Sequence, residues 1–128
     1  MNLLLTYFFS TLVTVAVANE IAIHFFLYWK YSWIDMPIHF LGGVSVALGI
    51  SILPFLRITL SPRLGTFFAY VTMTFTAGVA WEVFEFTNGI TKIEPGFYSD
   101  TFSDLCMDIL GGAIGYGIVR STKQIEHF

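Results

Sequence analysis

The chain has 128 residues, of which 55% are hydrophobic and 12% are charged, and its formal net charge is −3. Soluble domains carry about 25% charged residues, so this composition favours a membrane protein over a soluble one. The dispersed basic residues give no nucleic-acid-binding signature, and the single cysteine, Cys106, excludes a disulfide framework.

Four segments are long and apolar enough to cross a bilayer, which takes about 20 residues of helix. They predict helices at residues 3–28, 35–56, 65–88 and 100–120. A signal peptide is the rival interpretation of the first segment, but that segment lacks a basic N-terminal region and stays apolar through residues 21–29. We therefore expect an all-α fold, a four-helix transmembrane bundle in which residues 1–128 form a single domain.

The first two predicted helices carry polar residues close to the loop that connects them. Glu20 and His24 come near the end of the first helix, where they form either a private hydrogen-bonded pair or part of a larger site. Asp35 opens the second helix before a Met-Pro pair, so it is either a helix N-cap or a functional carboxylate. His39 lies one turn deeper, too deep for capping, which favours a functional role.

The last two predicted helices carry five more acids at the same depth. Glu82 and Glu85 lie near the end of the third helix, and Asp100, Asp104 and Asp108 open the fourth. Residues three or four apart share a helix face, so these acids can point inward as pairs. For Asp100 a helix-start role is the simpler interpretation, because acids in a first turn suit the helix dipole. The Thr-x-x-Asp run that ends at Asp104 resembles a capping box, whereas Asp108 and Glu82 lie too deep for capping.

Alternating helix directions place all of these groups in one half of the bilayer. An ionised side chain in the membrane centre costs about 3 kcal/mol, so such residues usually face the bundle interior and mark a function. Seven carboxylates face only Lys30 and Lys92 on that side, so either several are protonated or cations bind among them. Carboxylate and imidazole ligands suit magnesium, manganese, iron or zinc. The predicted metal ligands, with the additional candidates last, are Asp35, His39, Glu82, Glu85, Asp104 and Asp108, then Glu20, His24 and Asp100.

Basic residues indicate the orientation of the chain. The side that holds both termini and the loop near residues 56–64 carries four of them, against two on the other side. Because Lys and Arg are enriched in cytoplasmic loops, both termini are expected in the cytoplasm and the acids near the extracytoplasmic face.

Two nine-residue stretches, residues 35–43 and 104–112, share the pattern Asp-x-x-x-(His/Asp)-x-Leu-Gly-Gly. Each opens the second helix of a pair, so helices 1–2 and 3–4 look like two parallel two-helix repeats about an axis along the membrane normal. The glycines would let the second and fourth helices pack closely. Close packing would bring His39 and Asp108 into one shared site.

These residues also carry a resemblance to a known family. Over residues 35–117 the chain is similar to the VanZ-like superfamily of small membrane proteins, and closer to its YjdF-like inner-membrane branch, at Asp35, His39, Trp81, Glu82, Glu85, Asp104, Asp108, Gly111 and Gly115. It departs from VanZ-like proteins where Met36 replaces a lysine and where Glu85 and Asp108 replace neutral amides. The resemblance implies a multi-pass inner-membrane protein. VanZ-like proteins are associated with glycopeptide resistance, and the YjdF-like branch implies no activity.

A one-sided acidic cluster leads to competing functional hypotheses. The first is a metal-dependent intramembrane hydrolase or transferase that acts on a lipid or lipid-linked phosphate or ester, with Glu82, Glu85 and Asp104 as catalytic carboxylates. The second is a cation- or proton-binding transporter or channel, to which a homo-oligomer could add a pore. The third is a VanZ-like resistance or envelope protein, or a structural core, without catalysis. The inner halves of the helices carry no charged pathway, which favours the enzyme.

Overall fold

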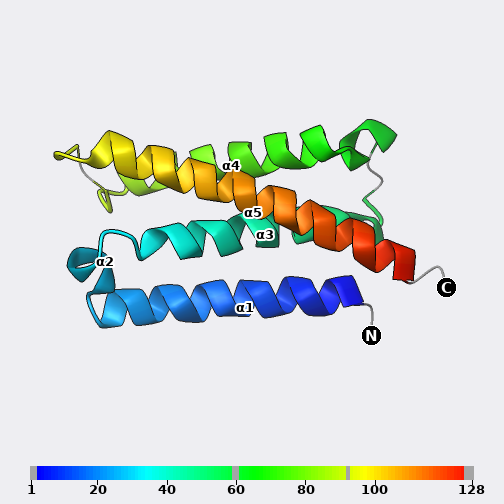
Figure 1. The fold of residues 1–128 in the computed structure, drawn as a ribbon, viewed down its shortest axis with the longest axis horizontal. Helices are drawn as coiled ribbons and strands as arrows, with labels where there is room; N and C mark the ends of the chain where they lie inside the picture. The colour runs from blue at the N-terminus through cyan, green and yellow to red at the C-terminus, as the bar shows by residue number, and fades with distance from the viewer. Residues whose placement is uncertain (1–2, 59–60, 92, 126–128) are drawn as a thin grey trace.

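The structure, a computed structural model, describes residues 3–58, 61–91 and 93–125, and these residues form only helices and the turns between them (Figure 1). The elements are α1 (Leu3–His24), α2 (Leu27–Lys30), α3 (Asp35–Ile52), the 3-10 turns η1 (Leu53–Leu56) and η2 (Pro62–Gly65), α4 (Phe67–Thr87) and α5 (Phe97–Ile125). The all-α fold class is confirmed. Lys92, one of the two basic residues expected near the acids, lies outside the described residues.

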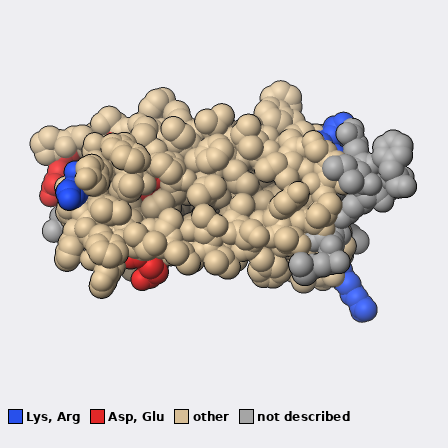
Figure 2. All heavy atoms as spheres, turned by 60° about the horizontal axis from the view of Figure 1, so that its bottom comes forward, with Lys and Arg blue, Asp and Glu red and all other residues tan. Residues whose placement is uncertain are grey.

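Four helices within the described ranges are long and apolar enough to cross a membrane: Leu3–His24, Asp35–Leu56, Phe67–Thr87 and Phe97–Thr122. Large apolar side chains such as Phe9 and Phe68 point outward from them, an arrangement that suits hydrocarbon rather than water. On the face shown in Figure 2, charged atoms lie toward the two ends and the middle is uncharged. The chain is therefore a multi-pass membrane protein, as its sequence predicts.

Helix α3 forms the centre of the bundle. Helices α1, α4 and α5 all pack against it, and its contact with α5 is the most extensive in the fold. Val44, Ala47 and Leu48 of α3 are buried at these contacts. Tyr70 of α4 and Val119 of α5 complete the same apolar cluster, which fills the half of the bundle that contains the start of α1.

Glycines set the distance between α3 and α5. A Cβ at Gly43 would meet the main-chain oxygen of Asp108, and a Cβ at Gly111 would meet the main-chain oxygen of Phe40. Because these obstacles are backbone atoms, no side-chain rotation could make room. The close packing predicted from the glycines is confirmed, and it places the first turns of α3 beside the middle of α5.

The two ends of the bundle differ in character. Helix α1 begins and α5 ends at one end, whereas α2 and the turn between α4 and α5 lie at the other (Figure 1). Asp35 opens α3 at the second end, and Glu85 lies near the last residue of α4 at that same end. We call it the acidic end.

Two predicted helix ends are wrong at the acidic end, where the backbone reverses direction. The first helix ends at His24 rather than at residue 28, because Phe26 adopts the left-handed conformation with a φ of 56° and separates α2 from α1. Helix α5 begins at Phe97 rather than at residue 100, directly after Gly96, whose φ of 103° favours glycine. It also continues to Ile125, past the predicted end at residue 120.

The other end of the bundle needs corrections of similar size. The segment predicted as a helix over residues 35–56 is α-helical to Ile52 and then becomes 3-10, where Pro54 lacks the N–H that an α-helix requires. The helix predicted over residues 65–88 covers 67–87, because the Thr66 side chain accepts a hydrogen bond from the main-chain N–H of Ala69 and caps its start.

Candidate functional site

His39 lies at the centre of a buried cluster at the acidic end. It is on the second turn of α3 and only 5% exposed. Its Nε2 lies 3.7 Å from Asp35 Oδ1, one turn earlier in α3, and 3.8 Å from Glu82 Oε1 on α4. Its Nδ1 lies 3.2 Å from Asp108 Oδ2 on α5. The cluster therefore joins three helices around one imidazole.

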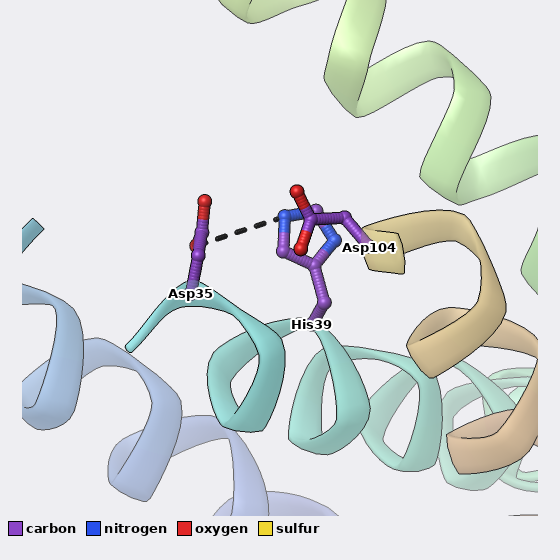
Figure 3. A group of neighbouring side chains, drawn as sticks. All are labelled: Asp35, His39 and Asp104. Carbon is purple, nitrogen blue, oxygen red and sulfur yellow. Dashed lines mark ion pairs between the residues drawn. The ribbon is translucent and has the colours of Figure 1, made fainter. Parts of the chain in front are cut away.

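Asp104 of α5 completes a group of side chains that could hold a metal ion. It is 3% exposed, and one ligand atom from each of Asp35, His39 and Asp104 lies within 4.8 Å of the other two. Figure 3 shows both carboxylates beside the imidazole ring. Three buried side-chain polar atoms in the described residues have no hydrogen-bond partner, and two of them, Asp104 Oδ1 and Glu82 Oε1, belong to this cluster; the third is Thr91 Oγ1. Buried acceptors without donors are costly, and a bound cation or proton would satisfy them.

Asp108 contacts the opposite side of the imidazole from Asp35 and Glu82. When His39 carries its proton on Nδ1, it donates a hydrogen bond to Asp108, and Nε2 is left as an electron-pair donor facing the other carboxylates. Asp108 is fixed there by packing, since a Cβ at Gly78 of α4 would meet its Oδ2. In metal sites, a carboxylate in this position orients the histidine that binds the metal. Asp108 is therefore placed to orient His39, and not to bind the same ion as Nε2.

The structure contradicts the capping interpretations of two acids. Asp35 is the first residue of α3 and follows an N-cap at Ile34 that has no side-chain cap hydrogen bond. Thr101 and Asp104 do not form a capping box, because α5 begins at Phe97 and both residues lie inside the helix. Thr101 Oγ1 instead donates a 2.9 Å hydrogen bond to Glu82 Oε2 and ties α5 to α4.

Glu85 faces a cavity of about 470 Å³ that borders the cluster. Asp35, His39 and Asp108 also line this cavity, whose remaining walls are mostly apolar side chains of α1, α3 and α4. Trp81 Nε1 donates a 2.9 Å hydrogen bond to Glu85 Oε1. Glu85 is therefore a positioned carboxylate at the polar end of an apolar cavity.

Three additional candidates stay outside the cluster. Glu20 and His24 of α1 are exposed, and the imidazole of His24 stacks edge-on with the ring of Phe25. Asp100 is also exposed, on the first turn of α5. These three have the right depth, but their side chains are exposed rather than buried in the cluster.

Four contributing residues were not singled out as site residues by the sequence. Trp81 donates a hydrogen bond to Glu85, and Thr101 donates one to Glu82. The position of Trp81, four residues before Glu85 on the same helix face, is the signal that could have identified Trp81. The other two are Tyr28 and Asn19, which both line the cavity, and the Tyr28 hydroxyl donates a 2.7 Å hydrogen bond to Asn19 Oδ1. Burial, reinforced by the negative charge of Asp35, raises the pKa of the Tyr28 hydroxyl and so further favours its protonated form, which donates the hydrogen bond.

The cluster also lies where the two sequence repeats meet. Asp35 and Asp104 occupy equivalent positions in the repeats, and so do His39 and Asp108. His39 and Asp108 contact each other, as equivalent residues do near an axis that relates two halves. Asp35 and Asp104 then approach the same imidazole from different helices.

One family of known proteins accounts for nearly the whole chain. A family model described as "Predicted membrane protein (DUF2238)" matches residues 1–123, a range that contains all four spans and the complete cluster. The chain matches no curated protein and no solved structure. The chain belongs to the predicted membrane protein family DUF2238.

Proposed function

We propose that the cluster binds a divalent cation and that the bound ion serves a hydrolase or transferase acting on a lipid or lipid-linked phosphate or ester. The ligands would be His39 Nε2 with carboxylate oxygens of Asp35, Glu82 and Asp104. The observation that carries the proposal is that two buried oxygens of the cluster, Glu82 Oε1 and Asp104 Oδ1, have no hydrogen-bond partner. Glu82 Oε1 lies 3.8 Å from His39 Nε2, and Asp104 lies within the group that could hold an ion with His39 and Asp35.

Distances within the cluster suit an ion. Separations of 3.7 and 3.8 Å between Nε2 and the two carboxylate oxygens are too long for hydrogen bonds. They leave room between the atoms for a centre about 2.0–2.2 Å from each, the bond length of zinc to nitrogen and oxygen ligands. Magnesium, manganese and iron accept the same donor types, so the proposal names the class of ion and not the element.

Charge supports a cation over hydrogen bonding alone. Four carboxylates surround one imidazole, and no Lys or Arg in the described part of the chain forms an ion pair with them. Carboxylates crowded at low dielectric cannot all stay ionised without compensation. A divalent ion supplies that compensation and would polarise a substrate oxygen or activate water.

Glu82 and Glu85 have different roles in the proposed reaction. Glu85, held through Oε1 by Trp81, keeps its second oxygen for the cavity and is placed to act as a general base. Thr101 fixes Glu82 through Oε2 and leaves Oε1 toward His39. In this proposal Glu82 and Asp104 hold the ion, and Glu85 moves the proton.

Orientation and family relationship belong to the proposal as well. The acidic end would face outward across a cell inner membrane, with both termini in the cytoplasm, because Arg57, Arg63 and Arg120 all lie toward the opposite end of the bundle. A VanZ-like or YjdF-like relationship fits the same residues. The substrate would then come from the outer leaflet, where lipid headgroups meet the cluster.

Cation or proton transport is the second candidate, and the same unpartnered oxygens favour it, since they could also hold protons. Below the cluster, however, the buried side chains of α3 are either apolar, as at Val44, Ala47 and Leu48, or carry only a hydroxyl, as at Ser45 and Ser51, so α3 offers no charged route to the other end. Transport would need either rocking between the two repeats or a pore formed by a homo-oligomer.

Turnover of lipids tests the catalytic part of the proposal. Purified protein, supplied with one divalent metal at a time, is incubated with liposomes of a mixed phospholipid extract, and the lipid products are followed by mass spectrometry. Glu85→Gln should abolish product formation while leaving metal content unchanged. Glu94→Gln, at an exposed loop position, should match the wild type. Turnover that survives in Glu85→Gln would remove Glu85 from the mechanism, and the absence of turnover with every metal would remove the enzyme proposal.

A further inference from the structure

The cavity beside the cluster is a slot between two helices. Helices α1 and α4 both pack on α3 and make almost no contact with each other. Leu12 and Ala16 of α1 line one wall, Ala77 of α4 lines the other, and Gly42 and Val46 of α3 line the floor. In a protein that spans a bilayer, the open side between α1 and α4 faces lipid.

The length of the slot matches one leaflet. Its lining extends along α3 from Asp35 to Val46 and along α4 from Glu85 to Thr74. Each stretch rises roughly 16 Å at 1.5 Å per residue, which is about half of a 30 Å hydrocarbon core. The end that contains Asp35, His39 and Glu85 is polar, and the end that contains Leu12 and Val46 is mostly apolar. With this length, the polar end lies at the membrane surface and the other end near the midplane.

We propose that this slot holds one hydrocarbon chain of an outer-leaflet lipid, which enters sideways between α1 and α4. The polar linkage of that lipid then lies beside Asp35, His39 and Glu85. A lipid bound in this way would be the substrate of the proposed function, and the role of the polar end of the slot rests on that function. Binding of the hydrocarbon chain in the slot needs no metal.

The size of the slot favours a lipid chain over a helix from a second protein. A volume of about 470 Å³ lies within the range of roughly 300–1,000 Å³ found for small-ligand sites. A helix with its side chains is about 10–12 Å across, so a stretch of it as long as the slot would need more than twice the volume that the slot offers. The floor is also open at Gly42, where an added Cβ would have no atom within 4 Å, so a larger side chain there would occupy the slot without disturbing the backbone.

Photo-crosslinking tests the inference. The full chain is reconstituted into phosphatidylethanolamine–phosphatidylglycerol vesicles that contain phosphatidylethanolamine with a diazirine in the middle of one acyl chain. After irradiation, the modified peptides are identified by mass spectrometry. Adducts should concentrate on the slot residues of α1, α3 and α4, and Gly42→Leu should remove most of them. Gly117→Leu is the matched control, because Gly117 also has open space around an added Cβ but does not line the slot.

Two further measurements make each outcome decisive. Ala16→Leu narrows the slot from α1 and should lower the adduct yield even if Gly42→Leu folds poorly. Metal content is measured on the same samples, since neither position is a proposed ligand. Slot adducts without bound metal would uphold the inference and sink the proposed function. Adducts spread evenly over all four helices, or unchanged in both slot variants, would show annular lipid only and overturn the inference.

Discussion

Replacing Gly43 by alanine should push α3 and α5 apart, whereas the same change at the neighbouring Gly42 should not. At Gly43 the new Cβ would meet the main-chain oxygen of Asp108, with the carbonyl carbon and Cα of that residue only 3.0 and 3.1 Å away. At Gly42 nothing lies within 4 Å. The two glycines are adjacent in one helix, so each variant controls for the other.

The expected difference in the free energy of unfolding between the two variants follows from two terms. Alanine is favoured over glycine in a helix by about 0.8–1.0 kcal/mol, and this gain is common to both variants. Overpacking costs about 1–3 kcal/mol and applies only at Gly43. The free energies of unfolding should therefore differ by about 1–3 kcal/mol, with Gly42→Ala the more stable, which is roughly 5- to 150-fold in the unfolding constant at 1.4 kcal/mol per tenfold.

Reversible unfolding in mixed micelles with increasing sodium dodecyl sulfate, followed by circular dichroism, measures that difference. Gly111→Ala should behave like Gly43→Ala, because its Cβ would meet the main-chain oxygen of Phe40. Equal stability of Gly42→Ala and Gly43→Ala would refute the close crossing of α3 and α5, and with it the geometry that brings His39 to Asp108.

Substitutions at three other positions have definite expected outcomes. Asp108→Asn should weaken metal binding about 10- to 100-fold, because His39 loses the carboxylate that orients it; competition with a chromogenic chelator measures this, and an unchanged affinity would exclude the orienting role. Thr101→Val should destabilise the fold by about 1–3 kcal/mol, because Glu82 Oε2 loses its donor, and an unaltered unfolding midpoint in micelles would argue against that bond. Phe26→Gly should stabilise the fold by up to about 1 kcal/mol by relieving the left-handed backbone, whereas Phe26→Val should destabilise it; the opposite order of thermal midpoints would contradict the assigned turn.

Much of the fold could be predicted because the bilayer simplifies the problem. Uncharged runs of the right length define the spans, and their alternation fixes which helix ends share a side. Depth alone then places Asp35, His39, Glu82, Asp104 and Asp108 at one level. The glycine pattern added the close contact between α3 and α5, which the structure bears out through the backbone atoms facing Gly43 and Gly111.

Helix rotation could not be predicted, and this explains the residues that lie outside the cluster. A helix that is apolar on every side gives no hydrophobic stripe from which to infer which face turns inward. Glu20 and His24 share the depth of the cluster, but α1 turns them outward. The exact role of Asp108 could not be predicted either, because sequence spacing does not show which imidazole nitrogen a carboxylate will contact; in the structure Asp108 contacts Nδ1 of His39.

The turns were the second limit, since they depend on single backbone conformations. Nothing in the composition of residues 21–29 marks Phe26 as left-handed, so the first helix was predicted to run too far. Helix α5 begins directly after Gly96, earlier than the positions of Asp100 and Asp104 indicate. Thr101 therefore lies inside the helix, where it forms an interhelical hydrogen bond and not a helix cap.

Elemental analysis of the purified protein addresses the cation site most directly. Wild-type protein, dialysed against each divalent metal and freed of excess, should retain about one ion per chain, whereas His39→Ala should retain essentially none while keeping its helical circular dichroism. His24→Ala, at an exposed histidine of α1, should retain the ion. Wild-type protein that is folded but holds no metal, or His39→Ala that holds as much as the wild type, would contradict the site.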